Sequence, residues 1–320
     1  MYSTPAVAGD LLFVASCNGR MRALDKKTGQ VKWEYDISKD GDQHEFHGDP
    51  LITDELVVIG TDGKMGHVYA FEQSTGLVRW KYRVDERGVA SDIARLGDDA
   101  YAVTISNELV CLDLKSGKSQ WTFRGGATAQ HCLTCSSPAA AADKVYFGGV
   151  DGFAYAVNAQ TGKLIWKRDL GARVTTSAVV RGSDLYLGTA KHGLYRLDAN
   201  SGEARGEIET QTAPSGHLVL SGDSLLAFLG GKVFASFDLE LKKLRWSAEA
   251  SNYWSSARPY VWHDAVLLGD QRELVAFRTS DGARQWSHEF PRTVRGIGTS
   301  AEVLYVGTLN GPVFAYSPGP

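Results

Sequence analysis

The sequence is poor in cysteine and contains no long apolar run. It has four cysteines among 320 residues, too few for a disulfide scaffold. No segment approaches the roughly 18 consecutive apolar residues of a membrane-spanning helix, so no transmembrane segment is predicted. There is also no excess of positive charge, because 34 Lys and Arg residues face 37 Asp and Glu residues. This balance argues against a nucleic-acid-binding protein, which needs a basic surface to neutralise phosphates.

A secretion signal and the common catalytic motifs are also missing. Met1 is followed directly by Tyr2-Ser3-Thr4-Pro5, which lacks the charged and apolar regions of a signal peptide. The chain is therefore either cytoplasmic or a mature domain whose leader was removed. The sequence contains no Gly-x-Ser-x-Gly elbow, no phosphate-binding glycine loop and no His-Glu-x-x-His. No catalytic residue is predicted.

Only one Cys-x-x-Cys pair is present, formed by Cys132 and Cys135. Such a pair can close a local disulfide or supply half of a zinc site, but a c-type haem motif requires a histidine where Ser136 stands. His44 and His47, with Asp42 and Asp49, are of ligand types that suit a metal. Their loop spacing matches no metal motif, and we predict no metal site.

One phrase dominates the chain as an internal repeat. It reads ALDKKTGQVKW at Ala23–Trp33 and AFEQSTGLVRW at Ala70–Trp80, and an eighth copy begins at Ala315. A period of 40 to 47 residues is typical of a four-stranded propeller blade. Each unit reads as short β-branched and aromatic runs separated by Gly, Asp and Asn, the signal of strands and turns. The last position of the phrase is tryptophan in six of the seven full copies: Trp33, Trp80, Trp121, Trp166, Trp246 and Trp286.

The repeated residues have physical roles in such a blade. The Thr-Gly pair, as in Thr28-Gly29, suits a hairpin that needs positive φ and a bulge, and Asp25 can accept hydrogen bonds from the turn backbone. The tryptophan is a large apolar plate that docks neighbouring blades. We therefore predict an all-β, eight-bladed β-propeller of four-stranded antiparallel blades, forming one domain over residues 1–320. Gly206 and Lys242 break the phrase, and we expect looser blade contacts there.

The eighth blade is expected to be incomplete. Its repeat supplies three strands and ends near Val313–Tyr316, before the position of a docking tryptophan. A propeller normally closes its ring by completing the last blade. We expect the native protein to extend further at its N-terminus and to supply the fourth strand from there.

The first strand of each blade should line a central channel. Aligning the repeats places a ring of polar residues at one mouth of this channel: Thr4, Asp49, Asp92, Ser137, Ser177, His217, Arg258 and Gly296, with Arg295 adjacent. One interpretation is a solvated lining in which Asp49 or Asp92 pairs with Arg258. The other is a ligand site.

Two long loops, 38–48 and 125–135, belong to the same face as this ring. Insertions on one face of a repeat protein often carry function. We expect the segments 36–49, 123–137 and 251–258 to form the interaction face, with His44, His47 and Trp254 as contact candidates.

The repeated phrase resembles the docking motif A-x-D-x-x-T-G-x-x-x-W of the PQQ-like, or quinoprotein-like, β-propellers, and it covers essentially the whole chain. In size and layout the chain is most similar to the BamB-type propellers of outer membrane assembly. That resemblance implies a monomeric, non-catalytic periplasmic scaffold that binds a protein partner through inter-blade loops and uses no cofactor. The alternatives are a PQQ- and calcium-dependent dehydrogenase, or a propeller that binds a sugar or another small ligand at the channel face.

Overall fold

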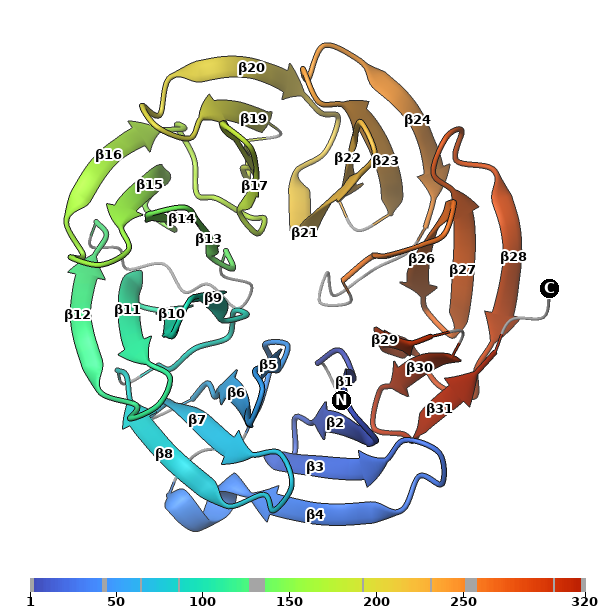
Figure 1. Cartoon of the computed structure of the whole chain (residues 1–320). Helices are drawn as coiled ribbons and strands as arrows, with labels where there is room; N and C mark the ends of the chain where they lie inside the picture. Colours follow the sequence, from blue (N-terminus) through green and yellow to red (C-terminus); the bar gives the residue numbers. More distant parts are fainter. Residues whose placement is uncertain are drawn as a thin grey trace.

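Eight small sheets surround a central axis (Figure 1). The computed structural model describes residues 3–41, 45–63, 65–85, 87–126, 136–191, 193–230, 232–250, 258–301 and 303–317. In each sheet the strands follow one another in sequence order and pair antiparallel. Seven sheets have four strands and the last has three. The predicted all-β, eight-bladed propeller is confirmed, and so is a three-stranded eighth blade.

The strands are short, and the only described helical element is the 3-10 turn η1 (Ile37–Asp40). No helix in the described part of the chain is long and apolar enough to cross a membrane. The first four blades comprise β1 (Ala6–Ala8), β2 (Leu11–Ala15), β3 (Arg20–Asp25), β4 (Val31–Asp36); β5 (Leu51–Ile52), β6 (Leu56–Gly60), β7 (His67–Glu72), β8 (Val78–Arg83); β9 (Ala94–Leu96), β10 (Asp99–Val103), β11 (Glu108–Asp113), β12 (Ser119–Arg124); β13 (Ala139–Ala141), β14 (Lys144–Gly148), β15 (Phe153–Asn158) and β16 (Leu164–Asp169).

The remaining four blades follow the same plan around the ring (Figure 1). They comprise β17 (Val179–Arg181), β18 (Asp184–Gly188), β19 (Gly193–Asp198), β20 (Ala204–Glu209); β21 (Pro214–Ser221), β22 (Ser224–Leu229), β23 (Val233–Asp238), β24 (Leu244–Glu249); β25 (Tyr260–Trp262), β26 (Ala265–Asp270), β27 (Glu273–Arg278), β28 (Arg284–Glu289); and β29 (Val294–Ser300), β30 (Val303–Thr308), β31 (Val313–Tyr316).

The turn between the third and fourth strands forms as the repeat predicts. Asp25 Oδ1 accepts from Lys27 N at 3.1 Å and Thr28 N at 2.9 Å, and Gly29 lies at φ +72°. The strand register then shifts between Ala23 and Leu24, which is the expected bulge. Because all of these contacts lie within one hairpin, the local sequence is enough to specify the turn.

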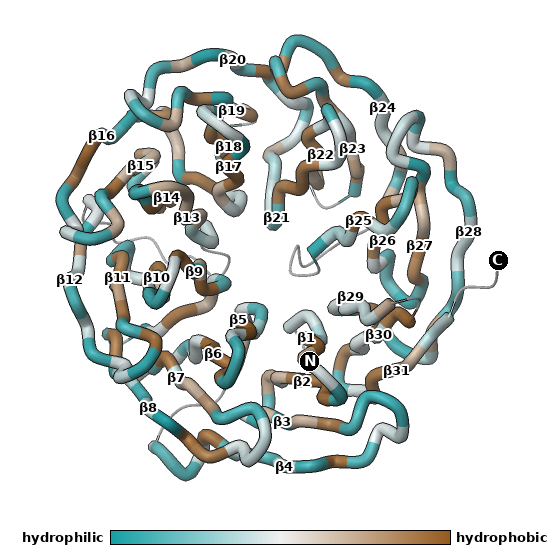
Figure 2. The backbone as a smooth tube through the Cα atoms, viewed as in Figure 1, coloured by the Kyte–Doolittle hydropathy of each residue, from teal (hydrophilic) through white to brown (hydrophobic). Residues whose placement is uncertain are grey.

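The core lies between the blades rather than within any one of them. Seven buried clusters each join two neighbouring sheets, in series from the first to the eighth. Figure 2 shows more hydrophobic residues along the inner strands of the blades and more hydrophilic residues along the outermost strands. The first strands of the eighth and first blades also meet, because a Cβ on Gly296 would lie 2.7 Å from Ser3 O. The absence of a side chain at Gly296 therefore allows the eighth and first blades to approach closely at the inner edge of the ring.

All seven docking positions lie on the fourth, outermost strands of their blades. Trp33, Trp80, Trp166 and Trp246 are buried, whereas Trp121 and Trp286 are half-buried. In the clearest example, the Trp166 indole Nε1 donates to Ala199 O of the next blade at 3.0 Å. Its ring lies against the turn of that blade, because a Cβ on Gly202 would come within 2.6 Å of it. The tryptophan of one blade and the turn glycine of the next therefore pack directly against each other.

The two breaks in the repeat lie at the same junction, between the fifth and sixth blades. Gly206 brings its backbone so close that a Cβ there would lie 2.5 Å from Glu240 O. Leu241 takes the positive φ of the turn, at 54°, and its side chain is buried in the cluster that joins these blades. Arg196 adds an ion pair to Glu240 at 2.8 Å. The expectation of looser contacts is wrong, because Leu241 and the close backbone approach replace the missing indole.

Candidate functional site

The polar residues that open the first strands are linked into an arc around the channel. Thr4 N donates to Asp49 Oδ1 at 2.6 Å, and Asp49 N donates to Asp92 Oδ1 at 2.8 Å. Asp92 N in turn donates to Ser137 Oγ at 3.1 Å. Each blade therefore presents a backbone N–H to the side chain of the next blade. The structure brings these sequence-aligned positions together.

The arc continues through the fifth and sixth blades with a different pattern. Ala178 N donates to Ser137 O at 3.0 Å, and Ser177 N donates to Gly216 O at 2.9 Å. Leu218 N returns a hydrogen bond to Ser177 Oγ at 3.1 Å. Small hydroxyl residues suit these positions because they satisfy backbone groups at the narrow inner edge of the ring.

Charged side chains bridge the channel. Arg258, which precedes β25, donates to Asp92 Oδ2, and its Nε lies 3.8 Å from Asp49 Oδ2. His217 on β21 also faces Asp92, with 3.6 Å between Nδ1 and Oδ2. The Arg258 side chain is 46% exposed whereas both carboxylates are largely covered, so Arg258 reaches in from the open side of the channel. The predicted internal pairs of Arg258 with Asp49 and Asp92 are present.

Burial and neighbouring charges shift the pKa values of Asp49, Asp92 and His217 in different directions. Burial, followed by repulsion from Asp92, raises the pKa of Asp49 to about 6. Burial also acts to raise the pKa of Asp92, but the charge of Arg258 and further partners outweigh it and lower the pKa. Burial lowers the pKa of His217 to about 4, so this imidazole is neutral at pH 7. At that pH the two carboxylates and one guanidinium leave a net charge of about −1 at this mouth.

Two other predicted residues lie elsewhere, and two are not described. Arg295 on β29 is 3% exposed, so its side chain does not line a solvated channel as expected. His47 does not join Asp49, which belongs to the channel arc. His44 and Trp254 lie outside the described residues, as do Cys132 and Cys135 and much of the predicted interaction face.

His47 instead lies between two acids on the face of the long loops. Its Nδ1 is 2.5 Å from Asp62 Oδ2, and its Nε2 is 3.0 Å from Glu45 Oε2. Burial acts to lower the pKa of His47, but the hydrogen bond and charge of Asp62, with Glu45, outweigh it and raise the pKa. Glu45 and Asp62 were missed from the sequence. The only signal was the Asp-Gly turn that follows β6.

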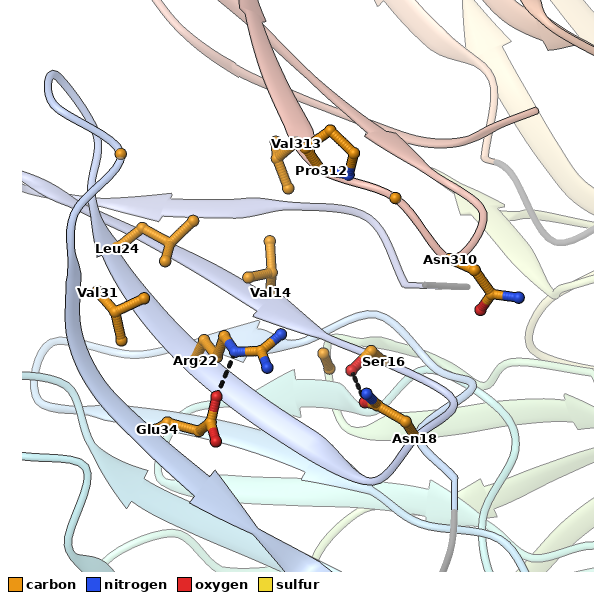
Figure 3. A pocket seen from close by; sticks show the side chains of 13 residues that line it. Val14, Ser16, Asn18, Arg22, Leu24, Val31, Glu34, Asn310, Pro312 and Val313 are labelled. Atoms are coloured by element: carbon orange, nitrogen blue, oxygen red, sulfur yellow. Dashed lines mark hydrogen bonds and ion pairs between the residues drawn. The ribbon is translucent and has the colours of Figure 1, made fainter. Parts of the chain in front are cut away.

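A groove of about 660 Å³ separates β31 from the first blade (Figure 3). It is lined by Val14, Leu24 and Val31 on one side and by Pro312 and Val313 on the other. A Cβ on Gly29 would meet nothing within 4 Å, whereas the equivalent turn glycines of other blades lie against a tryptophan. The groove therefore corresponds to the place that a fourth strand and its docking residue fill elsewhere in the ring.

The family of outer membrane protein assembly factor BamB matches residues 1–123, 53–188 and 190–319 of the chain. The chain belongs to this family. Among curated relatives, the BamB of Burkholderia pseudomallei is 24% identical over 300 residues, covering 87% of this chain and 73% of the relative. The BamB of Yersinia pestis is 23% identical, covering 73% of this chain and 60% of the relative. The aligned part thus falls below two thirds of the Yersinia protein.

Structural comparison agrees on the fold of this BamB-family chain. The crystal structure of BamB from Moraxella catarrhalis superposes with a TM-score of 0.82 at 19% identity, covering 98% of this chain and 96% of the other. A quinoprotein ethanol dehydrogenase of Pseudomonas aeruginosa matches only 28% of this chain and 16% of its own length, at 38% identity. That match spans about two repeat lengths, so it is local and does not extend over the whole ring.

Proposed function

We propose that this chain is a non-catalytic scaffold that binds another protein during outer membrane protein assembly, in the extracytoplasmic space of a bacterial envelope. The observation that carries the proposal is the family match, which extends over nearly all of the propeller rather than over single repeats. A match of that extent supports a shared role of the whole ring, whereas a local match supports only a shared motif.

The channel geometry supports a structural role for the polar ring. Asp49 and Asp92 already accept hydrogen bonds from neighbouring blades and share Arg258. Carboxylates that are covered and paired within the chain can fix the register of the elements that carry them. We therefore assign Asp49, Asp92 and Arg258 to fixing the inner edges of the second, third and seventh blades. The partner would contact the loops of the same face, including the segments that carry His44 and Trp254.

The direct test is genetic and biochemical. Deleting the gene from a bacterium that carries it should lower the amount of folded outer membrane β-barrel protein, measured by heat-modifiable mobility on gels. A His44→Glu/Trp254→Glu variant should fail to restore that level, whereas Lys26→Glu/Lys27→Glu, on a turn of the opposite face, should restore it. Unchanged folded barrels after deletion would reject the assembly role. Equal effects of the two double variants would reject the proposed face.

The partial quinoprotein match defines the competing function. Purified chain incubated with PQQ and Ca²⁺ should show no cofactor absorbance that comigrates with the protein and no rise in melting temperature. Ligand that binds only the native state must stabilise it by mass action. Comigrating PQQ with a concentration-dependent rise in Tm would favour the dehydrogenase instead of the scaffold.

A further inference from the structure

Three metal-ligating side chains meet on the loop face, outside the channel arc. Glu45 and His47 belong to the segment between η1 and β5, and Asp62 follows β6. One ligand atom from each residue lies within 4.8 Å of those from the other two. The two segments are also tied by a hydrogen bond from Asp62 N to Glu45 O at 3.3 Å. The cluster is therefore held by backbone pairing as well as by its side chains.

Asp62 is the least satisfied member of the cluster. The residue is 8% exposed, and its Oδ2 is taken by His47 Nδ1. Its Oδ1 is buried without a hydrogen-bond partner among the described residues. Leaving a buried acceptor unpaired destabilises a fold, so this oxygen is a place where an additional partner stabilises the protein.

The charge of the cluster also calls for a cation. Two carboxylates face one imidazole. The net charge of the three side chains is therefore −1 when His47 is protonated and −2 when it is neutral. A divalent ion would neutralise both carboxylates while the imidazole binds as a neutral ligand. No lysine or arginine is paired with Glu45 or Asp62 among the described ion pairs.

We propose that Glu45, His47 and Asp62 bind one divalent transition metal of the zinc class, with water completing the coordination. Mixed imidazole nitrogen and carboxylate oxygen ligands suit zinc rather than calcium, which prefers oxygen alone. Zinc bonds of about 2.0–2.2 Å place neighbouring ligand atoms about 3.3–3.5 Å apart. The 2.5 Å contact between His47 Nδ1 and Asp62 Oδ2 must therefore lengthen to admit the ion. The three ligand atoms, which lie within 4.8 Å of one another, must settle at this spacing, and the half-exposed Glu45 side chain, on the long loop, can make that movement.

Such a site would attach the long loop to the turn between β6 and β7. Both segments lie on the face that we assign to the protein partner, so the metal would fix the shape of that surface. The inference differs from the sequence-based expectation of no metal site. The reason is that sequence reasoning paired His47 with Asp42 and Asp49, whereas Asp49 belongs to the channel and Asp62 was not considered.

The test measures zinc binding by titration calorimetry and thermal melting. Thiols compete for zinc, so the parent is the full chain carrying Cys17→Ser, Cys132→Ser and Cys135→Ser. We expect one zinc per chain, a rise in Tm with zinc concentration, and weaker binding of calcium. His47→Gln and Asp62→Asn should each weaken zinc binding at least about tenfold. His288→Gln, on β28 of the seventh blade, is the matched control and should bind as the parent does.

Glu45→Gln separates loss of zinc binding from loss of folding. The Glu45 carboxylate is half-exposed, so replacing it by an amide should not disturb the packed core. The variant should fold as the parent does and still lose zinc affinity. The proposal is overturned by the absence of saturable binding up to about 1 mM zinc, which corresponds to about −4.1 kcal/mol. It is also overturned by full retention of binding in His47→Gln, or by equal affinity for calcium.

Discussion

Two turn glycines offer a matched measurement of tryptophan docking. Gly29 and Gly202 occupy the same turn position with φ of +72° and +74°, so an alanine at either one meets the same backbone strain of about 1–2 kcal/mol. They differ in their surroundings. A Cβ on Gly202 would lie 2.6 Å from the ring of Trp166, whereas a Cβ on Gly29 would meet nothing within 4 Å.

The difference between the two substitutions should therefore report the docking contact alone. Gly29→Ala is expected to cost about 1–2 kcal/mol of unfolding free energy. Gly202→Ala is expected to cost about 2–5 kcal/mol, because overpacking adds about 1–3 kcal/mol to the same strain. Urea unfolding followed by circular dichroism measures both values, and equal m-values would show that the unfolded states are comparable.

A double-mutant cycle separates the clash from other effects. In a Trp166→Ala background the ring is gone, so the excess cost of Gly202→Ala over Gly29→Ala should disappear. Gly282→Ala, where a Cβ would lie 2.5 Å from Trp246, should repeat the Gly202 result. If Gly29→Ala and Gly202→Ala cost the same within about 0.5 kcal/mol, the docking role of the turn glycine is refuted.

Further substitutions test the core, the irregular junction and the channel. Trp166→Ala should lower the unfolding free energy by about 3–5 kcal/mol, and a loss below about 1 kcal/mol would contradict its assignment to blade docking. Leu241→Ala should lower the unfolding free energy by about 2–5 kcal/mol in the same assay, because this buried leucine replaces the missing indole. A loss of about 0.5 kcal/mol or less, typical of surface positions, would contradict tight packing at this junction. Asp49 binds its proton more tightly in the folded state, where its pKa is raised to about 6, than in the unfolded chain. The stability of the wild type relative to Asp49→Asn should therefore rise as pH falls from about 6 to about 4, and a constant difference across denaturant melts in this window would contradict it.

Much of the fold could be predicted because the residues that define each hairpin lie close together within one repeat. Asp25 contacts Thr28 and Gly29 within the same hairpin, so a short sequence is enough to define the turn, the bulge and the position of Trp33. Repetition then supplies the architecture, since identical units with one docking plate each must pack side by side. The number of blades and the missing fourth strand in the eighth follow from counting these units.

The junction at Gly206 shows where this reasoning ends. The sequence revealed two departures from the motif, but it could not show that they face each other across one blade boundary. Only the packed structure places Leu241 in the cluster beside Gly206 and sets Arg196 against Glu240. Compensation between neighbouring blades depends on side-chain volume in three dimensions, which a repeat pattern does not encode.

The sequence by itself determined the propeller, its docking tryptophans and the residues that open each blade, because these depend on contacts within a hairpin or on a fixed period. The tertiary structure decided between the alternatives that the sequence left open and revealed pairs that the sequence did not suggest. Arg258 reaches Asp92 across a sequence separation of 166 residues, and His47 takes Glu45 and Asp62 instead of Asp49. The physical reason is that a ring brings distant loops to one face, where the direction of each chain segment, and not its residue types, selects the partners.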